Sequence, residues 1–145
     1  MKVHVHYVDD SKSLLISVRR ALAAANCKLG GEGVEFSFEP FNSVAAYKAS
    51  IMAQTCLTPD VVLIDMAMHG DRKAGIKLAE SVRKIFTAAH LIMFTQFDDA
   101  STIAESMAAG VDNFLAKSED FSTLPQAIID TLRLSPRPIA AQDAR

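Results

Sequence analysis

Apolar runs of strand length alternate along this chain with segments whose apolar residues recur every three or four positions. Strands are predicted over residues 2–8, 34–40, 61–65, 90–95 and 113–117. Helices are predicted from Ser11 or Ser13 to about Asn26, from Asn42 to about Thr55, and over residues 75–86, 98–109 and 121–134. This regular alternation is typical of an α/β domain built on a parallel sheet.

Two of the predicted strands differ in how deeply they are expected to be buried. Residues 61–65 read VVLID, a continuous apolar run that is typical of a central strand covered on both faces. Residues 34–40 instead alternate Val34, Phe36 and Phe38 with polar neighbours. This alternation predicts a strand nearer the edge of the sheet.

The remaining organisation of the chain is simple. Residues 135–145 contain two prolines and no periodic apolar face, so we expect a tail or linker after a single domain over residues 1–134. The length of 145 residues suits one ordinary domain, and no internal repeat is visible.

Composition and charge exclude several classes of protein. Half of the residues are hydrophobic and the net charge is -2, which excludes a disordered chain and disfavours direct nucleic-acid binding. No run approaches the ~18 apolar residues of a membrane span, and the N-terminus lacks the apolar core of a secretory signal. We therefore expect a cytoplasmic protein without membrane association. Cys27 and Cys56 lack a CxxC spacing and are expected to be reduced thiols.

Polar residues follow four of the apolar runs at the point where each predicted strand ends. They are the pair Asp9 and Asp10, then Asp65, Thr95 and Lys117. Because parallel strands of such a sheet carry their ligand-binding residues at one edge, we expect these side chains to meet there. Taken singly, an Asp pair can cap a helix and a Thr can simply end a strand. The ordered set predicts a site for a metal ion and a phosphoryl group.

This ordered set resembles the receiver domains of two-component response regulators. The resemblance covers roughly residues 3–134, with 30 residues from Asp65 to Thr95 and 22 from Thr95 to Lys117. It implies a flavodoxin-like, doubly wound sheet of five parallel strands in the order 2-1-3-4-5 with five helices. It also implies a phospho-acceptor switch that modifies only itself and is not a turnover enzyme.

The resemblance assigns a role to each residue of the site. Asp65 would accept a phosphoryl group from a histidine kinase or a histidine phosphotransfer protein. Mg²⁺ would be held by Asp9, Asp10, Asp65 and the backbone carbonyl of Ala67. Thr95 and Lys117 would contact the phosphoryl oxygens.

Further residues would transmit or time the signal. Thr95 and Phe114 would act as the switch that alters the face formed by the fourth helix, the fifth strand and the fifth helix. The same face is expected to bind partners, including a second copy in a homodimer. Ala67, Gln96 and Phe97 would control access of water to the phosphoryl group, and the apolar pair Ala67 and Phe97 predicts slow dephosphorylation.

The chain departs from the receiver pattern near two of its motifs. His69 and Ser118 stand where prolines are usual, and Gly75 comes about two residues late. The loop MAMHGDRKAG is therefore expected to have an unusual shape.

Three alternative functions remain open. A phosphatase of the haloacid dehalogenase type would need a second Asp two positions after the nucleophile, where Ala67 stands. A flavin or nucleotide carrier would need a phosphate loop where this chain has DDSKS. A degenerate receiver would bind proteins without being phosphorylated, although all five core residues are retained.

One further motif, the HxH of His4 and His6, places both imidazoles on one face of a strand. We interpret it as a packed or edge pair rather than a zinc site.

Overall fold

The computed structural model describes residues 1–29, 33–96, 100–117 and 121–134. Its elements in chain order are β1 (Lys2–Val8), α1 (Lys12–Leu29), β2 (Glu35–Phe41), α2 (Val44–Ala53), β3 (Val61–Asp65), α3 (Ala74–Ile85), β4 (His90–Thr95), α4 (Ala100–Ala108), β5 (Asn113–Ala116) and α5 (Leu124–Leu134). The five strands are parallel and lie in the order β2-β1-β3-β4-β5. The flavodoxin-like fold and the strand order predicted from the sequence are confirmed.

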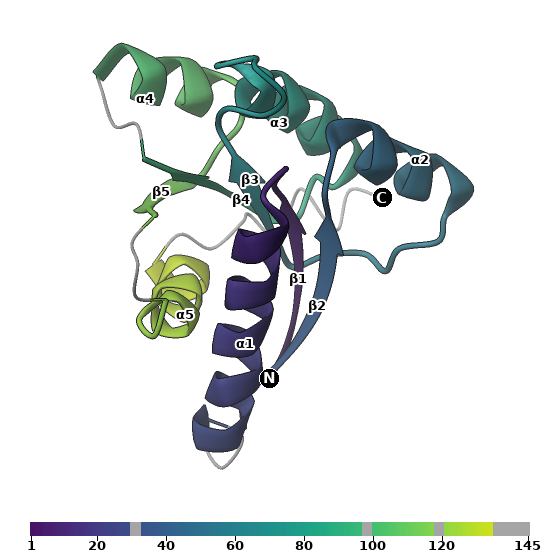
Figure 1. The fold of residues 1–145 in the computed structure, drawn as a ribbon. Helices are drawn as coiled ribbons and strands as arrows, with labels where there is room; N and C mark the ends of the chain where they lie inside the picture. Colours follow the sequence, from purple (N-terminus) through teal and green to yellow (C-terminus); the bar gives the residue numbers. More distant parts are fainter. Residues whose placement is uncertain (30–32, 97–99, 118–120, 135–145) are drawn as a thin grey trace.

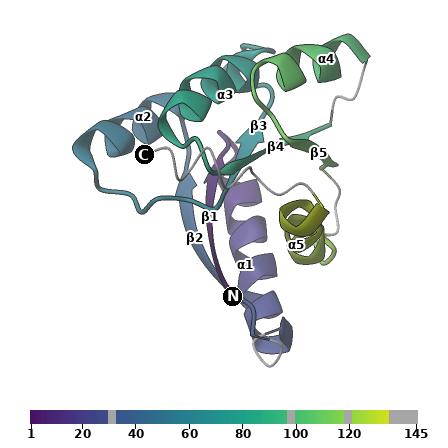
Figure 2. The same ribbon diagram turned by 180° about the vertical axis from the view of Figure 1, so that it is seen from behind.

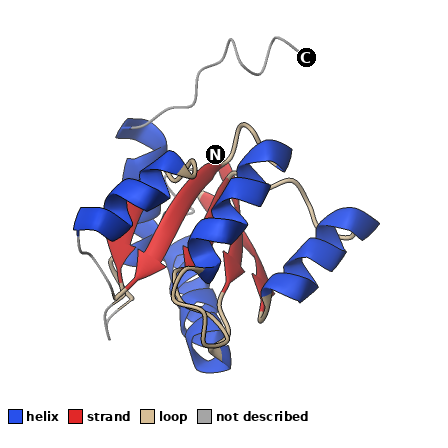
Figure 3. Cartoon of the chain, turned by 90° about the horizontal axis from the view of Figure 1, so that it is seen from above, coloured by secondary structure: helices blue, strands red, loops and turns tan. Residues whose placement is uncertain are grey.

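The sheet lies between two layers of helices. Helices α1 and α5 cover one face, and α2, α3 and α4 cover the other (Figure 1 and Figure 2). The layer of α2, α3 and α4 lies in front of the strands when the molecule is viewed from above (Figure 3). Because a crossover between parallel strands is right-handed, successive helices fall on one face until the strand order reverses.

A hydrophobic core lies on each face of the sheet, and the central strand β3 contributes side chains to both. Val61 and Leu63 pack on the α1–α5 side, whereas Val62 and Ile64 pack on the side of α2, α3 and α4. Strand β2 lies at one edge and alternates between buried and exposed residues over its first half. The predicted central strand at 61–65 is confirmed, and the predicted edge strand is confirmed with its bounds one residue later than 34–40.

Several helix boundaries differ from those predicted. Ser43, not Asn42, caps α2, since its side chain accepts a hydrogen bond from the backbone N–H of Ala46. Helix α1 continues to Leu29 rather than ending near Asn26. The amide of Asn26 instead exchanges two hydrogen bonds with the backbone of Phe36, at 2.7 and 2.9 Å. Asn26 therefore joins α1 to β2 and does not end the helix.

At the other end of the chain, α5 begins at Leu124 rather than near Phe121. Pro125 occupies its first turn, where the absence of a backbone N–H costs no helical hydrogen bond. Asp98 and Asp99 of the predicted fourth helix, Ser118, and the tail over 135–145 lie outside the described residues. Among the residues that are described, no helix has both the length and the apolar character to cross a membrane.

Gly75 allows α3 to approach the end of β3 closely. A Cβ atom at this position would lie 2.4 Å from the backbone oxygen of Asp65 and 2.8 Å from the Cα atom of Met66. The backbone N–H of Gly75 also donates to the carbonyl of Met66, at 2.8 Å. The missing side chain at Gly75 thus fixes where Asp65 lies relative to α3.

We predict that Gly75→Ala lowers the free energy of unfolding by about 1–3 kcal/mol, because the new methyl group must displace backbone rather than a flexible side chain. Its gain in helix propensity, about 1 kcal/mol, offsets only part of this. Urea unfolding measures the change. Gly70→Ala is the matched control: its Cβ would meet nothing within 4 Å and only the positive φ of 80° would be strained. A Gly75→Ala variant that is as stable as the wild type, or more stable, would contradict the steric argument.

Candidate functional site

Four of the predicted site residues come together at one edge of the sheet, where neighbouring parallel strands end. Asp9 follows β1, Asp65 and Thr95 are the last residues of β3 and β4, and Lys117 follows β5. Asp9, Asp65 and Thr95 are buried. The topology therefore brings together side chains that are far apart in the sequence.

The ammonium group of Lys117 links two of these strand ends. Its Nζ atom lies 2.7 Å from Oδ1 of Asp65 and 2.9 Å from Oδ2 of Asp9. The Lys117 side chain is 10% exposed and that of Asp9 is 1% exposed, so both ion pairs are shielded from water. The backbone N–H of Lys117 donates to the carbonyl of Thr95, which fixes the start of the loop after β5.

The pKa values of Lys117 and Asp65 are set by their burial and by the charged groups around them. Burial by itself lowers the pKa of Lys117, but hydrogen bonds to Asp65 and Asp9 outweigh burial and raise it. Burial raises the pKa of Asp65 to about 6, with a further increase from the charge of Asp9, although the hydrogen bond from Lys117 opposes both. One ammonium cannot neutralise both carboxylates, so a buried negative charge at Asp65 remains costly.

The acidic cluster has the donor set that Mg²⁺ prefers. One carboxylate oxygen from each of Asp9, Asp10 and Asp65 can be chosen such that all lie within 4.8 Å of one another. Mg²⁺ takes oxygen ligands and usually retains several waters. Asp10 is exposed, which leaves room for such waters on the outer side of the cluster. The residues present therefore fit this ion.

The loop after β3 explains why proline is absent at position 69. The backbone N–H of His69 donates to Oδ2 of Asp10 at 2.9 Å, and His69 has a φ of 51°. Gly70 follows with a φ of 80°, and Met68 and Asp71 exchange backbone hydrogen bonds across this two-residue turn. A proline has no N–H to donate and a φ near −65°, so it fits neither requirement. The loop thus orients Asp10 through its backbone.

Tyr7 is a site residue that the sequence reasoning missed. Its hydroxyl donates to Oδ2 of Asp9, the same oxygen that pairs with Lys117. Burial, together with the charge of Asp9, raises the pKa of Tyr7, so the hydroxyl stays protonated and can donate. Residues i and i+2 of a strand share a face. The position of Tyr7 two residues before Asp9 could therefore have predicted this contact from the sequence.

The predicted switch residue Phe114 lies against the hydrophobic core, whereas two of the residues predicted to control water access lie after strand ends. Phe114 is partly buried against the core beneath α2, α3 and α4. Ala67 lies partly exposed in the loop after β3, and Gln96 is exposed directly after Thr95. Phe97, the third predicted access residue, lies outside the described residues.

Comparison with known proteins identifies the family. The family model of the response regulator receiver domain matches residues 5–129, and the chain belongs to this family. The response regulator protein VraR of Staphylococcus aureus (strain NCTC 8325 / PS 47) is 25% identical over 134 residues, which cover 92% of this chain and 58% of VraR. The chain therefore spans less than two thirds of the length of this curated relative.

Solved structures share the fold at low sequence identity. The CheY-like receiver domain protein of Methanospirillum hungatei JF-1 superposes with a TM-score of 0.72 at 22% identity, covering 92% of this chain and 96% of that one. The isolated receiver domain of RcsB from Salmonella enterica serovar Typhimurium, determined with the phosphomimetic BeF3-, gives 0.71 at 19% identity, covering 95% and 93%. Receiver domains are signalling switches of two-component systems rather than turnover enzymes, and they generally bind Mg²⁺ at an acidic pocket.

We predict that Asp65→Asn stabilises the metal-free protein at pH 8 by on the order of 2 kcal/mol. The pKa of Asp65 in the folded state, about 6, lies above its unfolded value. Its contribution to stability is therefore present at low pH and is lost as the pH rises through about 6. The advantage of the Asn variant should shrink as the pH falls toward 5.

Urea unfolding in EDTA at a series of pH values measures this difference. Glu80→Gln, which removes an exposed carboxylate on α3, is the matched control and should show no such pH dependence. An Asn variant that is no more stable than the wild type at pH 8 would mean that Lys117 fully compensates the buried charge.

Proposed function

We propose that this protein is a phospho-acceptor switch that takes a phosphoryl group on Asp65 from a phosphohistidine of a histidine kinase or histidine phosphotransfer protein. The observation that carries the proposal is the buried ion pairing of Lys117 with both Asp65 and Asp9 beside the acidic cluster. Membership of the receiver family supports it. A haloacid dehalogenase-type phosphatase is disfavoured because Ala67 supplies no general acid.

The chemistry is a displacement at phosphorus. A carboxylate oxygen of Asp65 attacks the phosphorus atom, forming a P–O bond while the P–N bond to the donor histidine breaks. The raised pKa of Asp65 still leaves it mostly ionised at pH 7 and above. Lys117 would contact a phosphoryl oxygen once its bond to Asp65 is replaced, and the Thr95 hydroxyl would donate to another.

Mg²⁺, when bound, would supply positive charge that offsets repulsion between the carboxylates and the incoming phosphoryl group. Asp9, Asp10, Asp65 and the carbonyl of Ala67 would hold it. Tyr7 and the backbone N–H of His69 keep Asp9 and Asp10, respectively, in fixed orientations. Such preorganisation limits the rearrangement that metal binding requires.

The output of the switch would be the face formed by α4, β5 and α5. Phosphorylation would reposition Thr95 and, through it, Phe114 of β5, whose ring packs against the core beneath α4. Partner proteins, or a second copy of this chain, would distinguish the two states through that face. The signal would therefore run from the strand ends to the edge of the sheet that β5 forms.

We predict that incubation with Mg²⁺ and acetyl phosphate adds one phosphoryl group, detected by intact mass. Asp65→Asn should abolish the adduct, and both EDTA and Asp10→Ala should strongly reduce it. Asp130→Asn, which changes an exposed carboxylate on α5, is the matched control. An unmodified wild type would instead support a degenerate receiver that binds proteins without phosphorylation, and a modified Asn variant would identify another acceptor.

We also predict slow loss of the phosphoryl group, because Ala67 has no polar side chain to orient an attacking water. Ala67→Asn should shorten the lifetime of the phosphorylated protein about tenfold or more. The decay is followed by intact mass after the donor is removed at constant Mg²⁺. Unchanged or slower decay in the variant would assign control of water access to other residues, with Gln96 the nearest candidate.

A further inference from the structure

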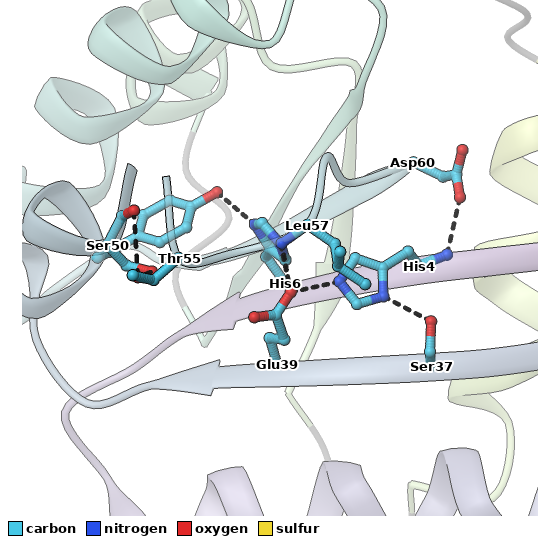
Figure 4. Close-up of polar contacts among 9 residues, drawn as sticks. His4, His6, Ser37, Glu39, Ser50, Thr55, Leu57 and Asp60 are labelled. Atoms are coloured by element: carbon cyan, nitrogen blue, oxygen red, sulfur yellow. Dashed lines mark hydrogen bonds and ion pairs between the residues drawn. The ribbon is translucent and has the colours of Figure 1, made fainter. Parts of the chain in front are cut away.

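A second group of metal-ligating side chains lies on strands β1 and β2, on the side covered by α2. Nε2 of His4 is 2.5 Å from Oε2 of Glu39, and Nε2 of His6 is 3.2 Å from the same oxygen. Ligand atoms of these three residues lie within 4.8 Å of one another. Figure 4 shows both imidazole rings turned toward the Glu39 carboxylate on the neighbouring strand.

Strand register explains this convergence. His6 pairs with Glu39 and His4 pairs with Ser37 in the parallel ladder between β1 and β2. Residues at alternate positions point to one face of a sheet, so the HxH of β1 meets the side chains at positions 37 and 39 of β2. An apolar pair would be expected at such positions in a buried strand.

Each imidazole is also held at its other nitrogen by a hydroxyl group. Nδ1 of His4 lies 2.5 Å from Oγ of Ser37, and Nδ1 of His6 lies 2.9 Å from Oη of Tyr47. Both Nε2 atoms therefore face Glu39, while both Nδ1 atoms have a fixed partner. A metal-binding histidine needs this arrangement, with one nitrogen on the ion and the other donating to an outer acceptor.

The hydroxyl partners suit both the metal-free and the metal-bound state. Because an ionised Glu39 carboxylate can only accept, we assign the protons to both Nε2 atoms in the metal-free state, which leaves the hydroxyls of Ser37 and Tyr47 to donate to Nδ1. With metal on Nε2, the imidazole tautomers reverse and the same hydroxyls accept, because a hydroxyl group can do either. Burial raises the pKa of Tyr47, so this hydroxyl keeps its proton.

The addition of Glu39 revises the sequence interpretation of His4 and His6 as a packed pair. We propose that His4, His6 and Glu39 form a binding site for a first-row divalent transition metal ion, with Zn²⁺ as the reference ion. Two imidazole nitrogens and one carboxylate oxygen form a known ligand set for zinc, in which water takes the fourth position. The Glu39 side chain is 28% exposed, which gives solvent access to the site. Nothing in the phosphoryl site requires these three residues.

The metal-free geometry is close to that of a loaded site. Tetrahedral zinc with bonds of about 2.0–2.1 Å separates neighbouring ligand atoms by about 3.3 Å. The pair of His6 and Glu39 already has this spacing, and that of His4 and Glu39 needs to open by less than about 1 Å. The backbone N–H of Leu57 donates to Oε2 of Glu39 at 3.0 Å and holds the carboxylate toward the histidines.

The site would be selective against Mg²⁺ and separate from the acidic cluster. Imidazole ligands favour zinc, copper or nickel, whereas Mg²⁺ requires oxygen ligands. Asp9 lies three positions after His6, which corresponds to about 10 Å along an extended strand. The rings of Phe41, Tyr47 and Phe86 contact His6, so aromatic side chains line the inner side of the site.

The test is a Zn²⁺ titration of the untagged chain in the presence of excess Mg²⁺, using competition with a chromophoric chelator. We expect one Zn²⁺ per chain and a rise in melting temperature, because the ion binds the folded state. Tyr47→Phe should weaken binding about tenfold to a hundredfold, as for other outer partners of ligating histidines. Glu39→Gln and His4→Gln should weaken it further.

Two control variants separate this site from other metal binding. His69→Gln removes an exposed imidazole elsewhere, and Asp10→Ala disrupts the acidic cluster; both should leave Zn²⁺ affinity unchanged. Circular dichroism checks that each variant is folded. If His4→Gln does not fold, the Zn²⁺ affinity of Glu39→Gln tests the proposal. Unchanged Zn²⁺ affinity in Glu39→Gln, or loss of binding in Asp10→Ala, would overturn the proposal.

Discussion

The ion pairing of one ammonium with two buried carboxylates is the interaction on which this molecule depends. Lys117 joins the ends of β1, β3 and β5 by holding Asp9 and Asp65 together. The charges do not balance, since Asp10 lies in the same cluster. A site with surplus negative charge favours a bound cation or protonation of Asp65, and either event relieves a cost that the fold already carries.

The surrounding structure holds these charges where repulsion alone would separate them. Gly75 lets α3 pack against the backbone at Asp65, and Tyr7 donates to Asp9 from within the opposite core. The turn at His69 and Gly70 presents a backbone N–H to Asp10. Each element acts on one carboxylate. Receiver chemistry is therefore compatible with an unusual β3–α3 loop, provided that the loop still supplies a donor to Asp10.

Strand β1 carries two different polar clusters on its two faces. Tyr7 points toward the core beneath α1 and α5 and serves the acidic site, whereas His4 and His6 face α2 and meet Glu39. Burial lowers the pKa of His6, which favours the neutral imidazole. Its two ring nitrogens contact the Tyr47 hydroxyl and the Glu39 carboxylate. Buried polar groups of this kind are tolerated only when every donor and acceptor has a partner.

The order of elements, the parallel sheet and the residues at the strand ends were determined by the sequence itself, because hydrophobic periodicity and strand-end position are local properties. Helix ends were less well determined: a side chain such as Asn26 can cap a helix or bond to a neighbouring strand, and only packing selects one. The same holds for Tyr7 and Glu39. Their roles depend on which strands become neighbours and in what register, and tertiary structure alone decides both.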